Sequence, residues 1–135
     1  MKLDVYVNFR GTCEEAFSFY ERNLGGRIIS MQRHDELPFP GNTPPEWGPK
    51  ILHGRIELGG MDLMGADIPG AEPMRSAYLS LRVDSAQEAE RVYALLIEDG
   101  EIFMKMEETF FAERFAMLRD RFGVSWMVMC EKKRS

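Results

Sequence analysis

The C-terminal part of the chain reads Glu108-Thr-Phe-Phe-Ala-Glu-Arg-Phe-Ala-Met-Leu-Arg-Asp-Arg-Phe-Gly-Val-Ser-Trp-Met-Val-Met-Cys130. Its β-branched, aromatic and apolar end, from Val124 to Met129, predicts a strand. The segment from Phe115 to Asp120 is long enough to pair with it, and Asp120-Arg-Phe-Gly123 predicts the turn, because glycine supplies a positive φ. We therefore predict a β-hairpin. The residues before it, Phe110-Phe-Ala-Glu113, are predicted to form a short loop whose two rings need a pocket.

A strand–helix unit occurs twice in the chain. Residues 4–9 and 77–83 each alternate apolar and polar side chains, which predicts half-buried strands. Each is followed by a Ser/Thr-x-x-Glu capping box and then by apolar residues at helical spacing. Five positions match at one offset of 73 residues: Thr12 with Ser85, Glu15 with Glu88, Ala16 with Ala89, Tyr20 with Tyr93, and Leu24 with Ile97. We interpret this as an internal duplication.

Further strands are predicted after each helix. In the first half these are residues 27–33 and a hairpin of residues 51–58 and 61–64 around Gly59-Gly60. In the second half, residues 101–105 precede the C-terminal hairpin. The sequence thus predicts an α+β fold of two βαβββ modules, at about residues 1–68 and 76–131 of one domain spanning residues 1–135.

Composition excludes several classes of protein. The 135 residues are 44% hydrophobic and 29% charged, which is ordinary for a globular domain. The net charge of −5 comes with no basic stripe, so nucleic-acid binding is not expected. The longest apolar runs are strand-sized, which argues against a membrane span or a signal peptide. Two cysteines make no disulfide framework, and the cytoplasm is the expected location.

A proline-rich segment interrupts the first half. Residues 34–49 hold five of the seven prolines and cannot form a helix or a central strand. A loop this long is either a lid or binding loop, or it is disordered. Trp47, Phe39 and Leu37 are the side chains that could anchor it.

The chain resembles the vicinal oxygen chelate superfamily, which includes glyoxalase I and the bleomycin-resistance proteins, and within it the PhnB-like branch. The matching residues run along nearly the whole chain: Gly11 with Cys13-Glu-Glu-Ala-Phe17, Phe19-Tyr20, Leu24-Gly-Gly26, Lys50-Ile-Leu-His53, Leu63-Met64 with Asp67, Glu108-Thr-Phe110, and Asp120-Arg-Phe-Gly123 with Trp126. The resemblance implies that the two modules form one open, cup-shaped mixed sheet with the helices on its outer face. It also implies a homodimer, in which modules can be exchanged between chains.

The resemblance also locates the places where related enzymes hold a metal ion. These fall on Asp4, Tyr78, Met64 and Met127, which make a poor ligand set for a hard divalent ion. Neither a metal nor a cofactor is therefore expected. A relocated site is the alternative, but His53 and Glu57 on one strand lie ~13 Å apart and cannot share an ion.

Two functions remain open from the sequence. One is a metal-free module that binds a small organic molecule in the concave cavity; the other is a metal-dependent lyase, isomerase or dioxygenase with displaced ligands. Arginines beside aromatic rings suit an anionic or planar ligand. Arg55 could equally pair with Glu57 or Asp62, and His53 could be tethered to a backbone carbonyl. The predicted ligand-binding residues are Trp47, His53, Arg55, Met64, Tyr78, Arg82, Phe110, Phe111, Glu113 and Met127.

Overall fold

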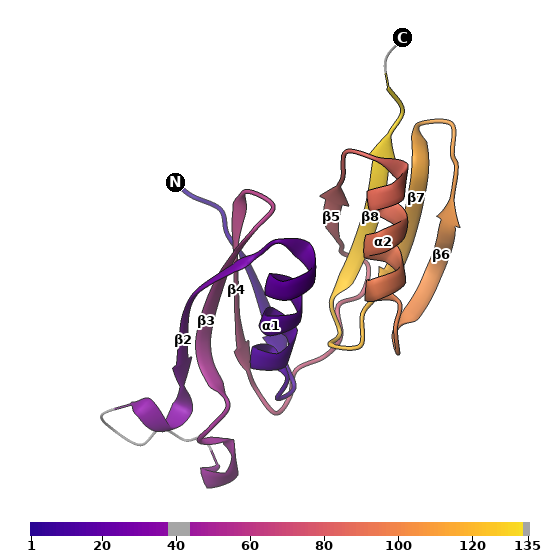
Figure 1. The fold of residues 1–135 in the computed structure, drawn as a ribbon. Helices are drawn as coiled ribbons and strands as arrows, with labels where there is room; N and C mark the ends of the chain where they lie inside the picture. The colour runs from indigo at the N-terminus through magenta and orange to yellow at the C-terminus, as the bar shows by residue number, and fades with distance from the viewer. Residues whose placement is uncertain (38–43, 134–135) are drawn as a thin grey trace. The chain divides into compact units, whose positions relative to one another are not determined.

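The computed structural model describes residues 1–37 and 44–133 and divides the chain into two compact units, Met1–Glu72 and Pro73–Ser135. Each unit has the same order of elements: a strand, a helix and three further strands (Figure 1). The fold is α+β, with two βαβββ modules, as the sequence predicts. No helix in the described residues has the length and hydropathy that crossing a membrane requires.

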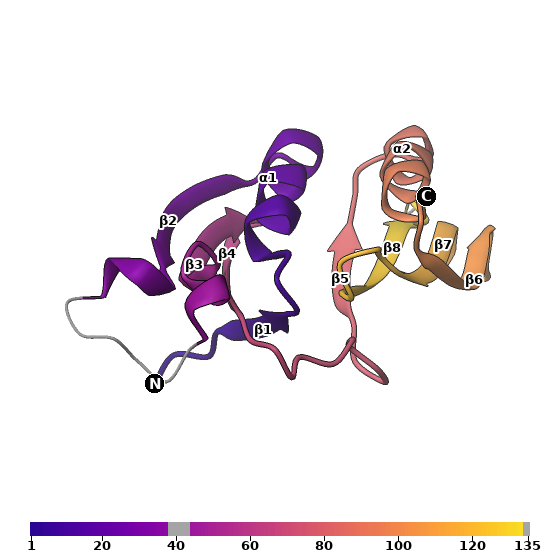
Figure 2. The ribbon, with the colours of Figure 1, turned by 90° about the horizontal axis from the view of Figure 1, so that it is seen from below.

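The first unit is a four-stranded mixed sheet in the order β1-β4-β3-β2. Strand β1 lies parallel to β4, and the other pairs are antiparallel. Helix α1 covers one face of this sheet and contacts β2, β3 and β4 (Figure 2). Its elements are β1 (Val5–Phe9), α1 (Cys13–Leu24), β2 (Arg27–Arg33), two 3-10 helices (His34–Glu36 and Pro45–Trp47), β3 (Ile51–Leu58) and β4 (Met61–Asp67).

The second unit repeats this plan with the strand order β5-β8-β7-β6. Strand β5 is parallel to β8, and α2 covers one face by packing on β7 and β8. Its elements are β5 (Leu79–Arg82), α2 (Ala86–Leu96), β6 (Glu101–Glu107), β7 (Ala112–Arg119) and β8 (Ser125–Glu131).

Strand alternation determines which side chains face the helix in each unit. In the first unit Phe9, Ile56 and Leu63 are buried with the α1 side chains Phe17 and Tyr20. In the second, the buried residues on the helix side of the sheet include Ala116, Leu118, Trp126 and Val128, and Leu96 comes from α2. Residues one position away in each strand therefore face away from the helix.

The predicted hairpin is confirmed, but its first strand begins earlier. Strand β7 starts at Ala112, so the expected loop at 110–113 is partly strand. Phe110 is 91% exposed and Phe111 is 41% exposed among the described residues, so the pocket expected for these rings stays a prediction. The two rings contact each other edge to face, and Phe111 also contacts Phe115.

The two capping boxes have different outcomes. Ser85 accepts a hydrogen bond from the backbone N–H of Glu88, as predicted. The side chain of Thr12 makes no cap hydrogen bond. The backbone N–H of Cys13 instead donates to the carboxylate of Asp67, 2.9 Å away, because the end of β4 brings that buried group to the helix terminus.

The proline-rich segment is partly ordered, with the two 3-10 helices at its ends. Trp47 is half-buried, and a Cβ added to Gly11 would lie 3.6 Å from its ring. Lys50 donates to the carbonyl of Gly11 at 2.9 Å, which fixes the same loop. Leu37 is 41% exposed, and Phe39 lies outside the described residues.

Candidate functional site

The face of the first sheet that points away from α1 carries a polar row. Arg55 lies opposite Met64 and Glu57 opposite Asp62, as the two-residue turn predicts. Arg55 binds Asp62 at 2.5 Å, so the ion-pair interpretation of this arginine is confirmed. The Nε atom of Arg55 is buried and has no hydrogen-bond partner among the described residues.

His53 is held by a tyrosine from β1. Its Nδ1 lies 3.3 Å from the hydroxyl of Tyr6, and the two rings stack with centroids 5.8 Å apart. The predicted tether to a backbone carbonyl is therefore wrong. Burial raises the pKa of the Tyr6 hydroxyl, which keeps it protonated and able to donate.

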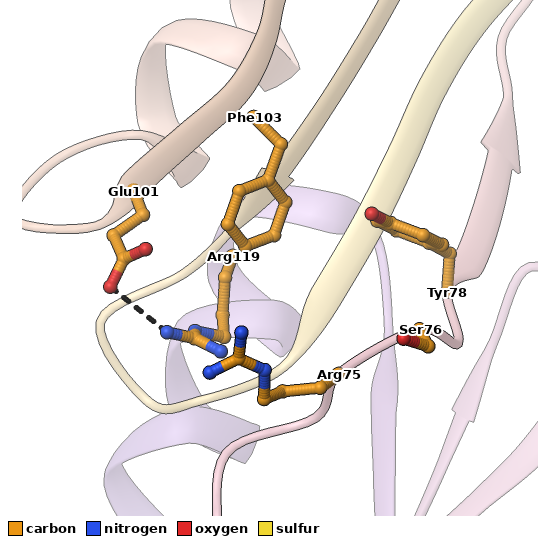
Figure 3. Close-up of a pocket in the computed structure, with 6 residues that line it drawn as sticks. All are labelled: Arg75, Ser76, Tyr78, Glu101, Phe103 and Arg119. Carbon is orange, nitrogen blue, oxygen red and sulfur yellow. Dashed lines mark hydrogen bonds and ion pairs between the residues drawn. The ribbon is translucent and has the colours of Figure 1, made fainter.

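A cavity of about 260 Å³ lies in the second unit. It is on the face away from α2, because Arg119 alternates with Leu118, which is fully buried on the helix side. It is formed where β5 and β6 begin and β7 ends, and Figure 3 shows the side chains that line it: Arg75, Ser76, Tyr78, Glu101, Phe103 and Arg119.

Arg119 is held in this cavity by two hydrogen bonds and a ring contact. Its guanidinium binds Glu101 at 2.9 Å and the backbone carbonyl of Met74 at 3.2 Å. It also lies over the ring of Phe103, 5.6 Å from the centroid. Only 14% of the Arg119 side chain is exposed, whereas the Glu101 side chain that it binds is 62% exposed.

Aromatic rings form the opposite wall. Tyr78 and Phe103 meet edge to face with centroids 6.4 Å apart. Phe103 is 46% exposed although it is a large apolar side chain. The cavity thus combines a fixed cation, a second arginine and two rings, which is a set that can bind an organic molecule but offers no nucleophile with a base beside it.

The predicted site residues are distributed over several places, and only Tyr78 lines the cavity. His53, Arg55 and Met64 lie on the outward face of the first sheet. Arg82 pairs with Glu131 at 3.3 Å, the Glu113 carboxylate accepts from Cys130, and Met127 lies beside Ser80 on the outward face of the second sheet. Trp47 lies against Gly11.

Sequence reasoning missed five cavity residues: Arg75, Ser76, Glu101, Phe103 and Arg119. The sequence does contain an indication of one ion pair, because Glu101 and Arg119 carry opposite charges and lie on strands that pair. Their register was not readable, because β6 contains irregularities after Ile102 and Met104. Arg75 lies outside any predicted element and gave no signal.

The positions where the superfamily holds a metal do not fit one. In the register of the parallel pairs, Tyr6 lies beside Met64, and Ser80 lies beside Met127. Asp4 and Tyr78 precede β1 and β5. Thioethers and neutral hydroxyls are weak donors for hard divalent ions. Among the described residues, no three His, Cys, Asp or Glu side chains gather to hold an ion.

Known proteins resemble this chain over nearly its whole length. The protein YjdN of Escherichia coli K12 is 31% identical, over 98% of this chain and 97% of its own. The crystal structure of PA1353 from Pseudomonas aeruginosa is 40% identical with a TM-score of 0.86, covering 98% of this chain and 99% of that one. A PhnB protein from Bacillus cereus is 26% identical with a TM-score of 0.80, covering 96% and 99%.

More distant structures share the fold alone. A glyoxylase/bleomycin resistance protein/dioxygenase domain from Frankia sp. EAN1pec has a TM-score of 0.64 at 16% identity, covering 98% of each chain.

The model of one family, described as 3-demethylubiquinone-9 3-methyltransferase, matches residues 1–129. The chain therefore belongs to this PhnB-like family, and it shares the fold of the glyoxylase/bleomycin resistance/dioxygenase domain.

Proposed function

We propose that this protein is a metal-free module that binds a small organic molecule on the outward face of its second sheet. The observation that carries the proposal is the cavity between β5, β6 and β7, which is lined by two aromatic rings and by Arg75, an arginine with no ion pair or hydrogen bond within the described residues. Its volume of about 260 Å³ is just below the ~300–1,000 Å³ typical of ligand pockets, so the ligand is small.

The proposal is binding and not methyl transfer, although the family description names that reaction. A nucleotide-type methyl donor is typically held by a glycine-rich turn in a doubly wound parallel sheet. In the described residues each sheet has a single parallel pair, β1 with β4 or β5 with β8. The sheet topology therefore supplies no such donor site.

A titration of isotope-labelled protein with a library of single-ring fragments tests this function by NMR. We expect the backbone signals of residues 75–78, 101–103 and 119 to shift with at least one fragment. Phe103→Ala should weaken that fragment at least fivefold. Phe110→Ala is the matched control, because Phe110 is an exposed ring outside the cavity, and should leave the affinity unchanged. A library that shifts none of these signals would refute the proposal.

The proposal includes a homodimer in the cytoplasm. Three consecutive apolar side chains of β6, Ile102, Phe103 and Met104, are 42–49% exposed, and an edge strand with such a surface favours association. The two free, buried cysteines suit a reducing compartment. Sedimentation equilibrium should give twice the chain mass of 15.6 kDa, and a monomer at all concentrations would contradict the dimer.

A further inference from the structure

The charges that line the second-unit cavity do not balance. Arg119 is paired with Glu101, so these two side chains neutralise each other. Arg75 adds a positive charge for which the structure gives no ion pair or hydrogen bond within the described residues. The lining therefore carries a net charge of +1, in a chain whose net charge is −5. A local positive site on an acidic protein attracts anions selectively.

The residue before Arg75, Met74, is held by hydrogen bonds from its backbone N–H and carbonyl groups. The N–H of Met74 donates to the carbonyl of Gly123 at 2.8 Å. The carbonyl of Met74 accepts from the hydroxyl of Ser125 at 2.9 Å and from Arg119. The next residue after Arg75, Ser76, has a left-handed φ of 59°. Such a conformation costs about 1 kcal/mol or more in a non-glycine residue and is concentrated at ligand-binding sites.

The rings determine the shape of the ligand. Arg119 lies near the ring of Phe103, and the ring of Tyr78 stands nearly perpendicular to it, at 83°. Figure 3 shows the guanidinium groups of Arg75 and Arg119 at the same end of the cavity, with the two rings beyond them. A flat molecule with a negative group at one end matches this arrangement, since guanidinium binds carboxylate with two parallel hydrogen bonds. The volume limits its body to about one ring.

We propose that the cavity binds a small flat organic carboxylate, with its anionic group on Arg75 and its conjugated body against Phe103 and Tyr78. This inference rests on the proposed binding function and adds the chemical class of the ligand. Arg75 supplies affinity for the charge, Arg119 holds the Phe103 ring, and the Ser76 conformation aims Arg75.

Four probes separate the contribution of the charge from that of the ring. Benzoate has both, benzamide has the ring without the charge, cyclohexanecarboxylate has the charge without a flat ring, and acetate has the charge alone. We expect benzoate to bind full-length protein at least tenfold more tightly than each of the others, as measured by NMR titration. Its affinity should fall as salt rises, because the cavity is open to solvent.

Variants of Arg75 test whether this side chain causes the preference for benzoate. Arg75→Gln should weaken benzoate at least tenfold, to the level of benzamide, and leave benzamide unchanged. Arg75→Lys should retain part of the affinity, because it keeps the charge but loses the planar fork. Arg22→Gln on α1 removes the same charge far along the chain, on the first unit, and should leave benzoate binding unchanged.

Three outcomes would overturn the inference: benzamide binding as tightly as benzoate, an unchanged benzoate affinity in Arg75→Gln, or an equal loss in Arg22→Gln. Fragments that bind the cavity only when neutral would overturn the ligand class and leave the binding function standing. If neither these probes nor any library fragment shifts the cavity signals, the binding function itself fails.

Discussion

Two buried carboxylates, those of Asp67 and Asp120, have a structural role, because they accept hydrogen bonds that hold elements of the fold together. Asp67 accepts from the backbone N–H groups of Cys13 and Ile51, both at 2.9 Å, and so joins the start of α1 to the start of β3. Asp120 accepts from the N–H groups of Phe122 and Val124 and from the indole of Trp126. The Asp-Arg-Phe-Gly motif followed by Trp is thus a structural device that closes the last hairpin.

Replacing Asp120 by asparagine should lower the free energy of unfolding by about 2–4 kcal/mol, because one amide NH₂ would then face buried N–H donors. Urea denaturation followed by tryptophan fluorescence measures this loss. The matched control is Asp84→Asn, which changes an exposed aspartate and should shift stability by less than ~0.5 kcal/mol. Equal stability of the two variants would show that Asp120 is not essential to the turn.

Cys13 makes stability depend on alkaline pH. Its thiol is fully buried, and burial raises its pKa, with smaller contributions from the negative charges of Asp67 and Glu14. The unfolded thiol ionises near pH ~8.5, whereas the folded thiol stays protonated. The stabilisation is therefore complete below pH ~8.5 and is lost as pH rises above it, by up to ~1.4 kcal/mol per pH unit.

Comparison with Cys13→Ala isolates this effect, because the other titrating groups are the same in both proteins. We expect the stability advantage of the native protein over the variant to be constant from pH 6 to 8 and to shrink from pH 9 to 10.5. Denaturation at each pH provides the measurement. Parallel stability curves across the whole range would contradict a raised thiol pKa.

Ser76 offers a test of backbone strain. Ser76→Gly should leave the protein equally stable or up to ~1 kcal/mol more stable, since glycine adopts a positive φ without steric cost. Ser76→Val should destabilise it by ~1 kcal/mol or more. Ser80→Gly in β5 is the control and should lose ~0.5–1 kcal/mol, as glycine does inside a strand. Thermal unfolding distinguishes these signs, and a clear loss in Ser76→Gly would rule out strain.

At the scale of elements, the duplication preserves a position but reverses its charge. The first residue of β2, Arg27, pairs with Glu57 of β3 at 2.6 Å. The first residue of β6, Glu101, pairs with Arg119 of β7 at 2.9 Å. The first pair is exposed and contributes little to stability. The second pair places Arg119 in the lining of the cavity. The same structural position therefore forms an exposed ion pair in the first module and part of the proposed binding site in the second.

A glycine precedes each of these strands, and the two glycines tolerate a side chain differently. A Cβ on Gly100 would lie 2.4 Å from the carbonyl oxygen of Arg119, whereas a Cβ on Gly26 would lie 2.9 Å from the movable end of Ile56 and 3.2 Å from the carbonyl of Glu57. Gly100→Ala should therefore cost ~2–4 kcal/mol, and Gly26→Ala about 1 kcal/mol or less. Urea denaturation ranks the two, and the reverse order would contradict the close approach at Gly100.

At the scale of the whole molecule, no three His, Cys, Asp or Glu side chains gather within residues 1–37 and 44–133 in a way that could hold a metal ion. Protein purified without chelator should contain no stoichiometric divalent ion, and dialysis against EDTA should leave the thermal midpoint and benzoate binding unchanged. Elemental analysis measures the metal content, and thermal unfolding and benzoate titration before and after dialysis measure the other two quantities. One bound ion per chain, with loss of binding after EDTA, would support the metal-dependent alternative instead.

The sequence by itself determined the two βαβββ modules, their strands to within a few residues, and the hairpin around Gly59 and Gly60. These features follow from local periodicity, turn residues and caps, which act over a few positions along the chain. The tertiary structure alone decided that Asp67 replaces Thr12 as a helix cap and that Arg75, Phe103 and Arg119 share a cavity. Such contacts join residues 16 to 54 positions apart, and their partners depend on strand register and bulges, which no local pattern encodes.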